Sequence, residues 1–242
     1  MGVSSGPAVV LTRETEDNAP LKQALVKMGI PVVEAPCLAT EYVVTPCPEG
    51  VFQATVFTSR RGVTGVLRCT WGSHWLQSPR AGLLAAVGES TARELRRSGF
   101  SPGLVADPPG GENLGHLLQA RLQAGDRVAA IQGNLRAAGL DVVLTSAGVT
   151  VQPVVVYRNR EVEPPALAPS SVKAVLAASP SAARRLLSAN PWMRCARFVA
   201  AGPTTAQELR RLGVSRVEIA GVGIDEQLSA LFRSSSEEGT TR

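Results

Sequence analysis

The stretch "AVGESTARELRRSGF" at Ala86–Phe100 has a second copy, "AGPTTAQELRRLGV", at Ala201–Val214, and this repeat decides the fold. Aligning Gly88 with Gly202 matches Thr91 with Thr205, Ala92 with Ala206, Glu94 with Glu208, Leu95 with Leu209, Arg96 with Arg210, Arg97 with Arg211 and Gly99 with Gly213. So many identities within so short a window indicate an internal duplication. Each copy is typical of a strand, a turn and a glycine-closed helix, with the turn predicted at Glu89–Thr91.

The segments around the first copy alternate between strand and helix patterns. A strand is predicted at Ala8–Arg13, a helix at about Ala19–Met28 and a second strand in "IPVVEAP" (30–36). "ATVFTSRRGV" (54–63) is a strand that leads into a helix, and "LLAAVG" (83–88) is the next strand. A parallel pair of strands joined by a helix is the elementary unit of a doubly wound sheet.

The second half of the chain restarts the same pattern. The strand at Asp126–Asn134 matches Ala8–Arg13, a helix is predicted around Leu135–Ala147, and Val149–Arg158 matches "IPVVEAP". "VKAVLAASPSAARRLL" (172–187) parallels the stretch from residue 54, and "IDEQLSALF" (224–232) parallels the helix near residues 114–122. The sequence therefore predicts an α/β protein with two similar doubly wound, Rossmann-like or flavodoxin-like, parallel-sheet domains.

Three segments lack this periodicity. The Pro-rich "EVEPPALAPSS" (161–171) and the stretch "APCLATEYVVTPCPEG" (35–50) are typical of connections between packed bodies. The polar tail "RSSSEEGTTR" (233–242) is expected to be disordered.

Composition excludes several classes of protein. In 242 residues, 44% are hydrophobic and 19% charged, and no apolar run approaches the roughly 20 residues of a membrane span. The N-terminus has no secretory pattern, so a cytoplasmic protein is expected. Four cysteines and two histidines without metal-ligand spacing predict no metal site.

The charge pattern favours a small acidic ligand. The net charge of +5 arises from 25 basic and 20 acidic residues spread along the chain, and aromatic residues make up only 4%. Nucleic-acid binders need clustered charge or stacking platforms, so that class is not favoured. The sequence also lacks the GxGxxG, GxxxxGK[ST] and GxSxG patterns of dinucleotide, nucleotide and acyl-transfer sites.

Small hydroxyl residues are predicted where strands end and helices begin. They are Ser59, Thr91, Ser179 and Thr205, with Ser90 and Thr204 beside them. Ligands of open α/β sheets bind outside the carboxyl ends of strands, where helix N-termini present unpaired N–H groups to anions. The alternative is that each hydroxyl is an ordinary N-cap, although four at equivalent places favour a shared cleft.

In order and spacing, the motifs resemble those of the uroporphyrinogen-III synthase family over nearly the whole chain. The motifs that carry this resemblance are "VLTR" (10–13), "VFTSRRGV" (56–63), "AVGESTARELRRSGF", "QGN" (132–134), "VVVYR" (154–158), "AASPSAA" (177–183) and "AAGPTTAQELRRLGV". The resemblance implies two α/β domains joined by a two-strand linker, with the active site in the cleft between them. The implied domain bounds are 1–35 plus 164–242 for one domain and 39–160 for the other.

The resemblance also implies a cofactor-independent lyase of tetrapyrrole biosynthesis, expected to act as a monomer. Such an enzyme cyclises hydroxymethylbilane, a linear tetrapyrrole polycarboxylate, to uroporphyrinogen III with loss of water and inversion of ring D. Loss of the hydroxyl leaves an azafulvene, which the substituted carbon of ring D attacks to form a spiro intermediate. Holding that geometry against spontaneous, non-inverting closure is a task of orientation.

The family's proposed catalytic tyrosine matches Tyr157, which would assist departure of the hydroxyl by hydrogen bonding. Without the resemblance, Tyr157 would be interpreted as a strand-end aromatic that packs against the linker. The matched substrate-binding positions are Arg13, Ser59, Ser90, Thr91, Gly133, Asn134, Ser179, Thr204 and Thr205. A conformational role for Arg13 at its strand end is an equal alternative to pairing with a carboxylate.

The chain departs from the family pattern at Gln53, where many members have an acidic residue, and at Gln132, where an arginine is common. Neither departure removes a proposed catalytic group. A non-catalytic two-domain binding or sensor protein for an acidic small molecule is the alternative function, and retention of Tyr157 favours the enzyme.

Overall fold

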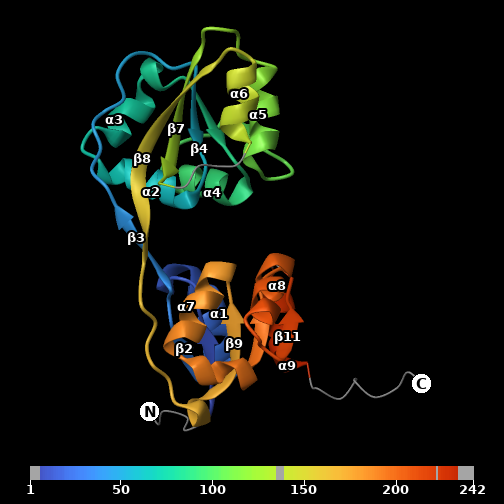
Figure 1. The fold of residues 1–242 in the computed structure, drawn as a ribbon. Coiled ribbons are helices and arrows are strands. Elements are labelled where there is room, and N and C mark those ends of the chain that lie inside the picture. The colour runs from blue at the N-terminus through green and yellow to red at the C-terminus, as the bar shows by residue number, and fades with distance from the viewer. Residues whose placement is uncertain (1–5, 135–138, 222, 234–242) are drawn as a thin grey trace. The chain divides into compact units, whose positions relative to one another are not determined.

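The structure, a computed structural model, describes residues 6–134, 139–221 and 223–233. The chain divides into two compact units, each built on its own sheet (Figure 1). Unit 1 comprises Met1–Ala39 and Arg160–Arg242, and unit 2 comprises Thr40–Asn159. The chain therefore passes from unit 1 to unit 2 and back again.

The sheet of unit 2 has six strands in the order β3-β8-β7-β4-β5-β6. Its strands and helices are β3 (Leu38–Tyr42), β4 (Ala54–Phe57), α2 (Arg60–Arg68), α3 (Gly72–Gln77), β5 (Leu83–Ala86), α4 (Glu89–Arg97), β6 (Leu104–Val105), α5 (Gly111–Gln119), β7 (Arg127–Gly133), α6 (Leu140–Ser146) and β8 (Thr150–Glu161). The pairs β8-β7, β7-β4, β4-β5 and β5-β6 are parallel. The first and last of these strands, β3 and β8, contain the two points where the chain passes between units.

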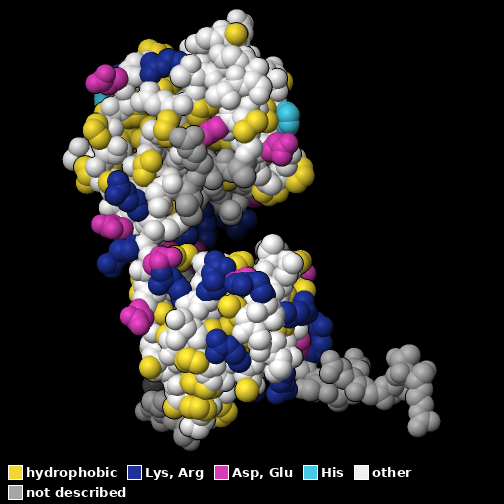
Figure 2. Space-filling view, viewed as in Figure 1, with side chains coloured by type: hydrophobic (Ala, Val, Ile, Leu, Met, Phe, Trp, Pro, Cys, Tyr) yellow, Lys and Arg dark blue, Asp and Glu magenta, His cyan; other side chains and the backbone are white. Residues whose placement is uncertain are grey.

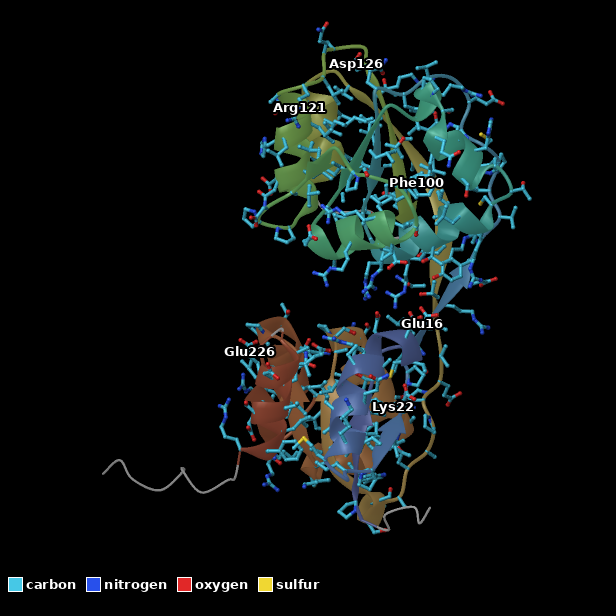
Figure 3. All side chains as sticks on the ribbon, turned by 180° about the vertical axis from the view of Figure 1, so that it is seen from behind. Glu16, Lys22, Phe100, Arg121, Asp126 and Glu226 are labelled. Atoms are coloured by element: carbon cyan, nitrogen blue, oxygen red, sulfur yellow. The ribbon has the colours of Figure 1, made fainter. Side chains whose placement is uncertain are left out.

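The sheet of unit 1 has five strands in the order β11-β10-β9-β1-β2, all paired in parallel. Its elements are β1 (Ala8–Leu11), α1 (Thr15–Lys27), β2 (Val32–Glu34), β9 (Val172–Ala177), α7 (Pro180–Ala189), β10 (Arg197–Ala200), α8 (Pro203–Arg211), β11 (Arg216–Ile219) and α9 (Ile224–Phe232). In the first turn of α9, the carboxylate of Glu226, labelled in Figure 3, accepts a hydrogen bond from the Gly223 N–H at 3.1 Å.

Both sheets follow one topology. Starting from β4 in unit 2 and from β9 in unit 1, the successive strands lie in the order 3-2-1-4-5, which is the doubly wound Rossmann order without its sixth strand. In unit 1 the last β-α-β segment of that order is supplied by β1, α1 and β2, from the N-terminus. The strands that the repeat matches, β7 with β1 and β8 with β2, occupy equivalent places in the two sheets.

Each sheet is buried on both faces, which explains the continuous apolar strands "AVVL" and "ATVF". In unit 2, α2, α3 and α4 pack against one face, and α5 and α6 against the other. Phe100, labelled in Figure 3, follows α4 and joins the first of these cores. In unit 1, α7 and α8 cover one face, and α1 and α9 the other.

Several predicted boundaries are wrong. The helix predicted from about Ala19 begins at Thr15, and the strand predicted over 83–88 ends at Ala86. Glu89–Thr91 is the first turn of α4 rather than a separate turn, because the Gly88 carbonyl already accepts the Thr91 and Ala92 N–H groups. The first strand ends at Leu11, two residues before the predicted end. Residues 135–138 of the predicted helix at 135–147 and residues 234–242 of the predicted tail lie outside the described residues.

Candidate active site

The carboxyl ends of β4 and β7, at Phe57 and Gly133, mark the point in unit 2 where the strand order reverses, and this point is termed the crevice of unit 2. These neighbouring strands are followed by helices on opposite faces of the sheet, since α2 packs in one core and α6 in the other. Such a reversal of strand order is where open α/β sheets bind ligands. Ser59 follows β4 at this point, Gly133 ends β7, and Tyr157 lies on the next strand, β8.

Ser59 and Tyr157 are joined by a hydrogen bond of 2.9 Å between Ser59 Oγ and Tyr157 Oη. Ser59 is also the N-cap of α2, because its Oγ accepts the Gly62 N–H at 3.1 Å. The backbone hydrogen bond fixes the Ser59 oxygen, which leaves its proton available to donate to the phenol oxygen. In that arrangement the Tyr157 O–H is itself available to a bound ligand.

Gly133 makes room for the Tyr157 ring. The two residues are paired across β7 and β8, after a register shift between Gln132 and Gly133. A Cβ at Gly133 would lie 2.5 Å from Tyr157 Cε2 and 3.0 Å from its Oη, well inside van der Waals contact. Tyr157 is only 8% exposed and belongs to the core under α2 and α4, so its ring is held from both sides. The arrangement fixes the phenol with little rotational freedom.

Asn134 ties the end of β7 to β8. Its side-chain Oδ1 accepts the Asn159 N–H at 3.0 Å, while the residue itself is exposed. The structure therefore brings four of the predicted site residues of unit 2 together: Ser59, Gly133, Asn134 and Tyr157.

The equivalent crevice of unit 1 lies between β9 and β1. Ser179 follows β9 and is the N-cap of α7, with its Oγ accepting the Ala182 N–H at 3.2 Å. Arg13 follows β1, where its carbonyl accepts a hydrogen bond from Asn18 Nδ2 at 2.7 Å. Its guanidinium is partly exposed and has no hydrogen-bonding or ionic partner within the described residues. A cation is thus available beside Ser179.

The two threonines that are identical in both copies of the repeat are buried, and the hydroxyl residues just before them are exposed. Thr91 and Thr205 are 2% and 3% exposed, at the third position of α4 and α8. Ser90 and Thr204, one residue earlier, are exposed. The hydroxyls of the motif that solvent or a ligand can reach are therefore Ser90 and Thr204. Within the described residues, neither makes a hydrogen bond to the Ser59–Tyr157 pair.

Comparison with known proteins identifies the family. The model of the family described as "Uroporphyrinogen-III synthase HemD" matches residues 19–224, which is most of the chain. The chain belongs to the uroporphyrinogen-III synthase family. The resemblance stated from the motifs is confirmed, and the family implies an enzyme of tetrapyrrole synthesis with a tetrapyrrole substrate.

Solved structures of the same family share the fold. A uroporphyrinogen-III synthetase from Helicobacter pylori is 19% identical, with a TM-score of 0.61 over 92% of this chain and 97% of the other. A mutant uroporphyrinogen III synthase from Thermus thermophilus is 22% identical, with a TM-score of 0.54 over 87% of this chain and 92% of the other. No curated protein sequence matches the chain.

Relative to the family pattern, the departure at Gln53 has a structural explanation. Gln53 precedes β4, and its Oε1 accepts the Arg127 N–H at 2.8 Å where β7 begins. This bond lies at the amino ends of the strands, whereas the Ser59–Tyr157 pair lies beyond the carboxyl end of β4. Gln53 therefore stabilises the pairing of β4 with β7 at the end of the sheet opposite the crevice.

Glu208 of the repeated motif is also structural. Hydrogen bonds from Arg211 and then Arg184 lower the pKa of the Glu208 carboxyl to about 2. Because Arg184 lies on α7 and Arg211 on α8, the carboxylate joins the two helices. Glu208 thus stabilises the packing of α7 and α8 within unit 1.

Two threonines that link neighbouring strands at their carboxyl ends were not among the predicted site residues. Thr58 Oγ1 donates to the Ile131 carbonyl at 3.3 Å, across β4 and β7. Thr12 Oγ1 donates to the Leu176 carbonyl at 3.0 Å and accepts the Ala178 N–H at 2.9 Å, across β1 and β9. The signal was available, because each threonine directly follows its strand.

In the described part of the chain, no helix is both long and apolar enough to cross a membrane. On the face of the molecule shown in Figure 2, basic side chains are scattered over both units with acidic ones among them.

Burial raises the pKa of the Cys37 thiol to about 11, so this cysteine stays a neutral packing residue.

Proposed function

We propose that the chain is a cofactor-independent lyase that converts hydroxymethylbilane to uroporphyrinogen III and water, with inversion of ring D. The observation that carries the proposal is a Tyr157–Ser59 hydrogen bond at a ligand-binding crevice, in a chain that belongs to the uroporphyrinogen-III synthase family. The alternative, a binding or sensor protein without turnover, is not favoured by membership of a family of synthases.

The first step breaks the C–O bond of the hydroxymethyl group. The Tyr157 O–H donates a hydrogen bond to the leaving hydroxyl, which departs as water with the proton lost from the ring A pyrrole N–H, and ring A is left as the azafulvene electrophile. Ser59 orients this donor in the arrangement where its own proton is directed at the phenol oxygen, with the Gly62 N–H holding Ser59 Oγ. The substituted carbon of ring D then attacks to form the spiro intermediate, which fragments and recloses.

The acetate and propionate arms need donors, and the crevices offer several. The exposed hydroxyls of Ser90 and Thr204 lie in the first turns of α4 and α8, where unpaired N–H groups and the helix dipole favour anions by about 0.3–1 kcal/mol each. In unit 1, Arg13 supplies a cation and Ser179, after the adjacent strand, supplies a hydroxyl. In unit 2, Asn134 supplies an amide at the crevice. Thr91 and Thr205 would act through backbone placement, since their side chains are buried.

We further propose that residues 1–35 with 164–242 form one domain and residues 39–160 the other, with β3 and β8 as a two-strand linker and the active site in the cleft between them. Two features support this organisation. The chain passes between its compact units within β3 and β8, and each unit carries its candidate residues at the carboxyl ends of its strands. The proposed enzyme works as a cytoplasmic monomer.

Hydroxymethylbilane generated in the same reaction vessel tests the function. We expect the protein to yield the type III isomer faster than the spontaneous reaction yields type I, and isomers separated by chromatography would show it. Production of type I alone at the spontaneous rate would make the enzyme proposal wrong.

Tyr157→Phe tests the catalytic residue. We expect the variant to fold and to form type III product more slowly by roughly 10²-fold or more, because one hydrogen-bond donor at the reacting atom is removed. The measurement is kcat from initial rates, with melting temperature as the check on folding. Wild-type kcat in this variant would exclude the phenol as the assisting group.

A further inference from the structure

Gln132 has a buried oxygen with no partner. The residue is 3% exposed, and its Oε1 makes no hydrogen bond in the described structure, where Trp75 Nε1 is the other such buried side-chain atom. A buried amide oxygen without a donor destabilises the folded state, so native structures rarely keep one. An atom of this kind at a ligand-binding crevice indicates a partner that arrives with the ligand.

The position of Gln132 is that of the crevice itself. It lies next to Gly133 at the carboxyl end of β7, and Gly133 is the residue paired with Tyr157. The register shift between Gln132 and Gly133 marks a local irregularity of the strand at this place. Such irregularities re-aim side chains and often occur beside functional sites.

The strand register of the two sheets independently relates Gln132 to a predicted substrate-binding residue, Arg13. Phe57, two residues before the N-cap Ser59, is paired with Ile131, so Gln132 is one residue beyond that pair. In unit 1, Leu11 is paired with Leu176, and one further step along both strands places Thr12 opposite Ala177, two residues before the N-cap Ser179. Arg13 therefore occupies in unit 1 the place that Gln132 occupies in unit 2.

The chemistry of a linear tetrapyrrole supplies the missing donor. Its acidic arms are ionised acceptors at neutral pH, which Arg13 and helix N-termini suit. Its pyrrole N–H groups are donors and need acceptors such as an amide oxygen. The equivalent positions Arg13 and Gln132 thus match the two kinds of group that the substrate carries.

We propose that Gln132 binds the substrate, with its Oε1 accepting a hydrogen bond from a pyrrole N–H of the bilane, and thereby orients that ring for the inverting attack. The inference rests on the proposed function and adds a neutral, ring-directed contact to it. It predicts opposite effects on stability and on binding when the amide is removed, because the acceptor is unsatisfied only in the free protein.

The test is Gln132→Met, which keeps the length of the side chain and removes the amide. We expect a melting temperature equal to or above that of the wild type, with kcat/KM for type III formation lowered roughly tenfold, mainly through KM. Because no charge is removed, the fold-change in KM should be the same at low and high salt. The matched control is Gln227→Met on α9, where a buried glutamine has a partner, so stability should fall with KM unchanged.

The outcomes separate the two proposals. Wild-type protein that forms no type III product overturns the proposed function and this inference with it. Active wild type together with an unchanged KM in Gln132→Met overturns only the role of Gln132. Should Gln132→Met not fold, Gln132→Asn replaces it, because withdrawing the amide by one methylene should raise KM, and a wild-type KM there would equally overturn the inference.

Discussion

Replacing Gly133 by alanine tests whether catalysis depends on the fixed position of Tyr157. The added Cβ would lie 2.5 Å from Tyr157 Cε2, 2.6 Å from Cζ and 3.0 Å from Oη. Ordinary contact begins near 3.4 Å, so the ring must move by about 0.9 Å to relieve the closest overlap. The phenol is 8% exposed and packed in a core, so this displacement must be shared with its neighbours.

The displacement has two separable consequences. Moving the ring by about 0.9 Å from a 2.9 Å contact with Ser59 is enough to break that hydrogen bond if the movement is outward. Overpacking a core of this kind costs about 1–3 kcal/mol, so the melting temperature should fall by several degrees. The displaced donor no longer meets the leaving hydroxyl, and misplacement by about 1 Å lowers rates by roughly 10²-fold.

The assay is type III product formation from hydroxymethylbilane, together with thermal unfolding. Gly103→Ala is the matched control, because its Cβ would also lie 2.5 Å from a neighbour, but that neighbour is the methyl end of Leu83, which can turn away. We expect the control to keep wild-type kcat with a smaller loss of stability. Wild-type kcat in Gly133→Ala would refute the reasoning, since the ring would then act from a displaced position.

Four further variants test the remaining contacts. Ser59→Ala and Ser179→Ala should each lose about 0.5–2 kcal/mol of unfolding free energy with the N-cap, whereas kcat should fall clearly only in Ser59→Ala; equal kcat losses would contradict the role of the Tyr157 contact. Glu208 contributes stability above its usual pKa of 4.5 that is lost as pH falls towards 2, so Glu208→Gln should flatten the acid side of the thermal stability profile, and an unchanged slope would be contrary evidence. Asn190→Ala should lower the unfolding free energy by about 2–4 kcal/mol, because the buried Asn190 side chain accepts one backbone hydrogen bond and donates two; urea denaturation with less than half this loss would argue against it.

Much of the sheet structure could be predicted from the sequence. Apolar runs such as "AVVL" and "ATVF" are read as strands because both faces of each sheet are covered, and the repeat matched the strands that hold equivalent places. Ser59 and Ser179 were placed at strand ends because a hydroxyl that begins a helix is a strong local signal. The N-cap interpretation is confirmed for both residues, and each follows the carboxyl end of its strand.

The burial of Thr91 and Thr205 could also have been predicted. Each lies four residues before a leucine of the same helix, and residues four apart share a face. Leu95 and Leu209 are fully buried, so the threonines face the sheet with them. By contrast, the pairing of Gly133 with Tyr157 depends on a register shift within β7, for which the sequence has no local signal.

The duplication and the chemistry are carried by different residues. Two of the identical pairs, Ala92 with Ala206 and Leu95 with Leu209, are completely buried, so their identity reflects the shared packing of a helix on a sheet. Tyr157 has no counterpart in unit 1, where β2 ends at Glu34 without an aromatic residue. Under the proposed function, the reaction would therefore occur in unit 2, beside Tyr157.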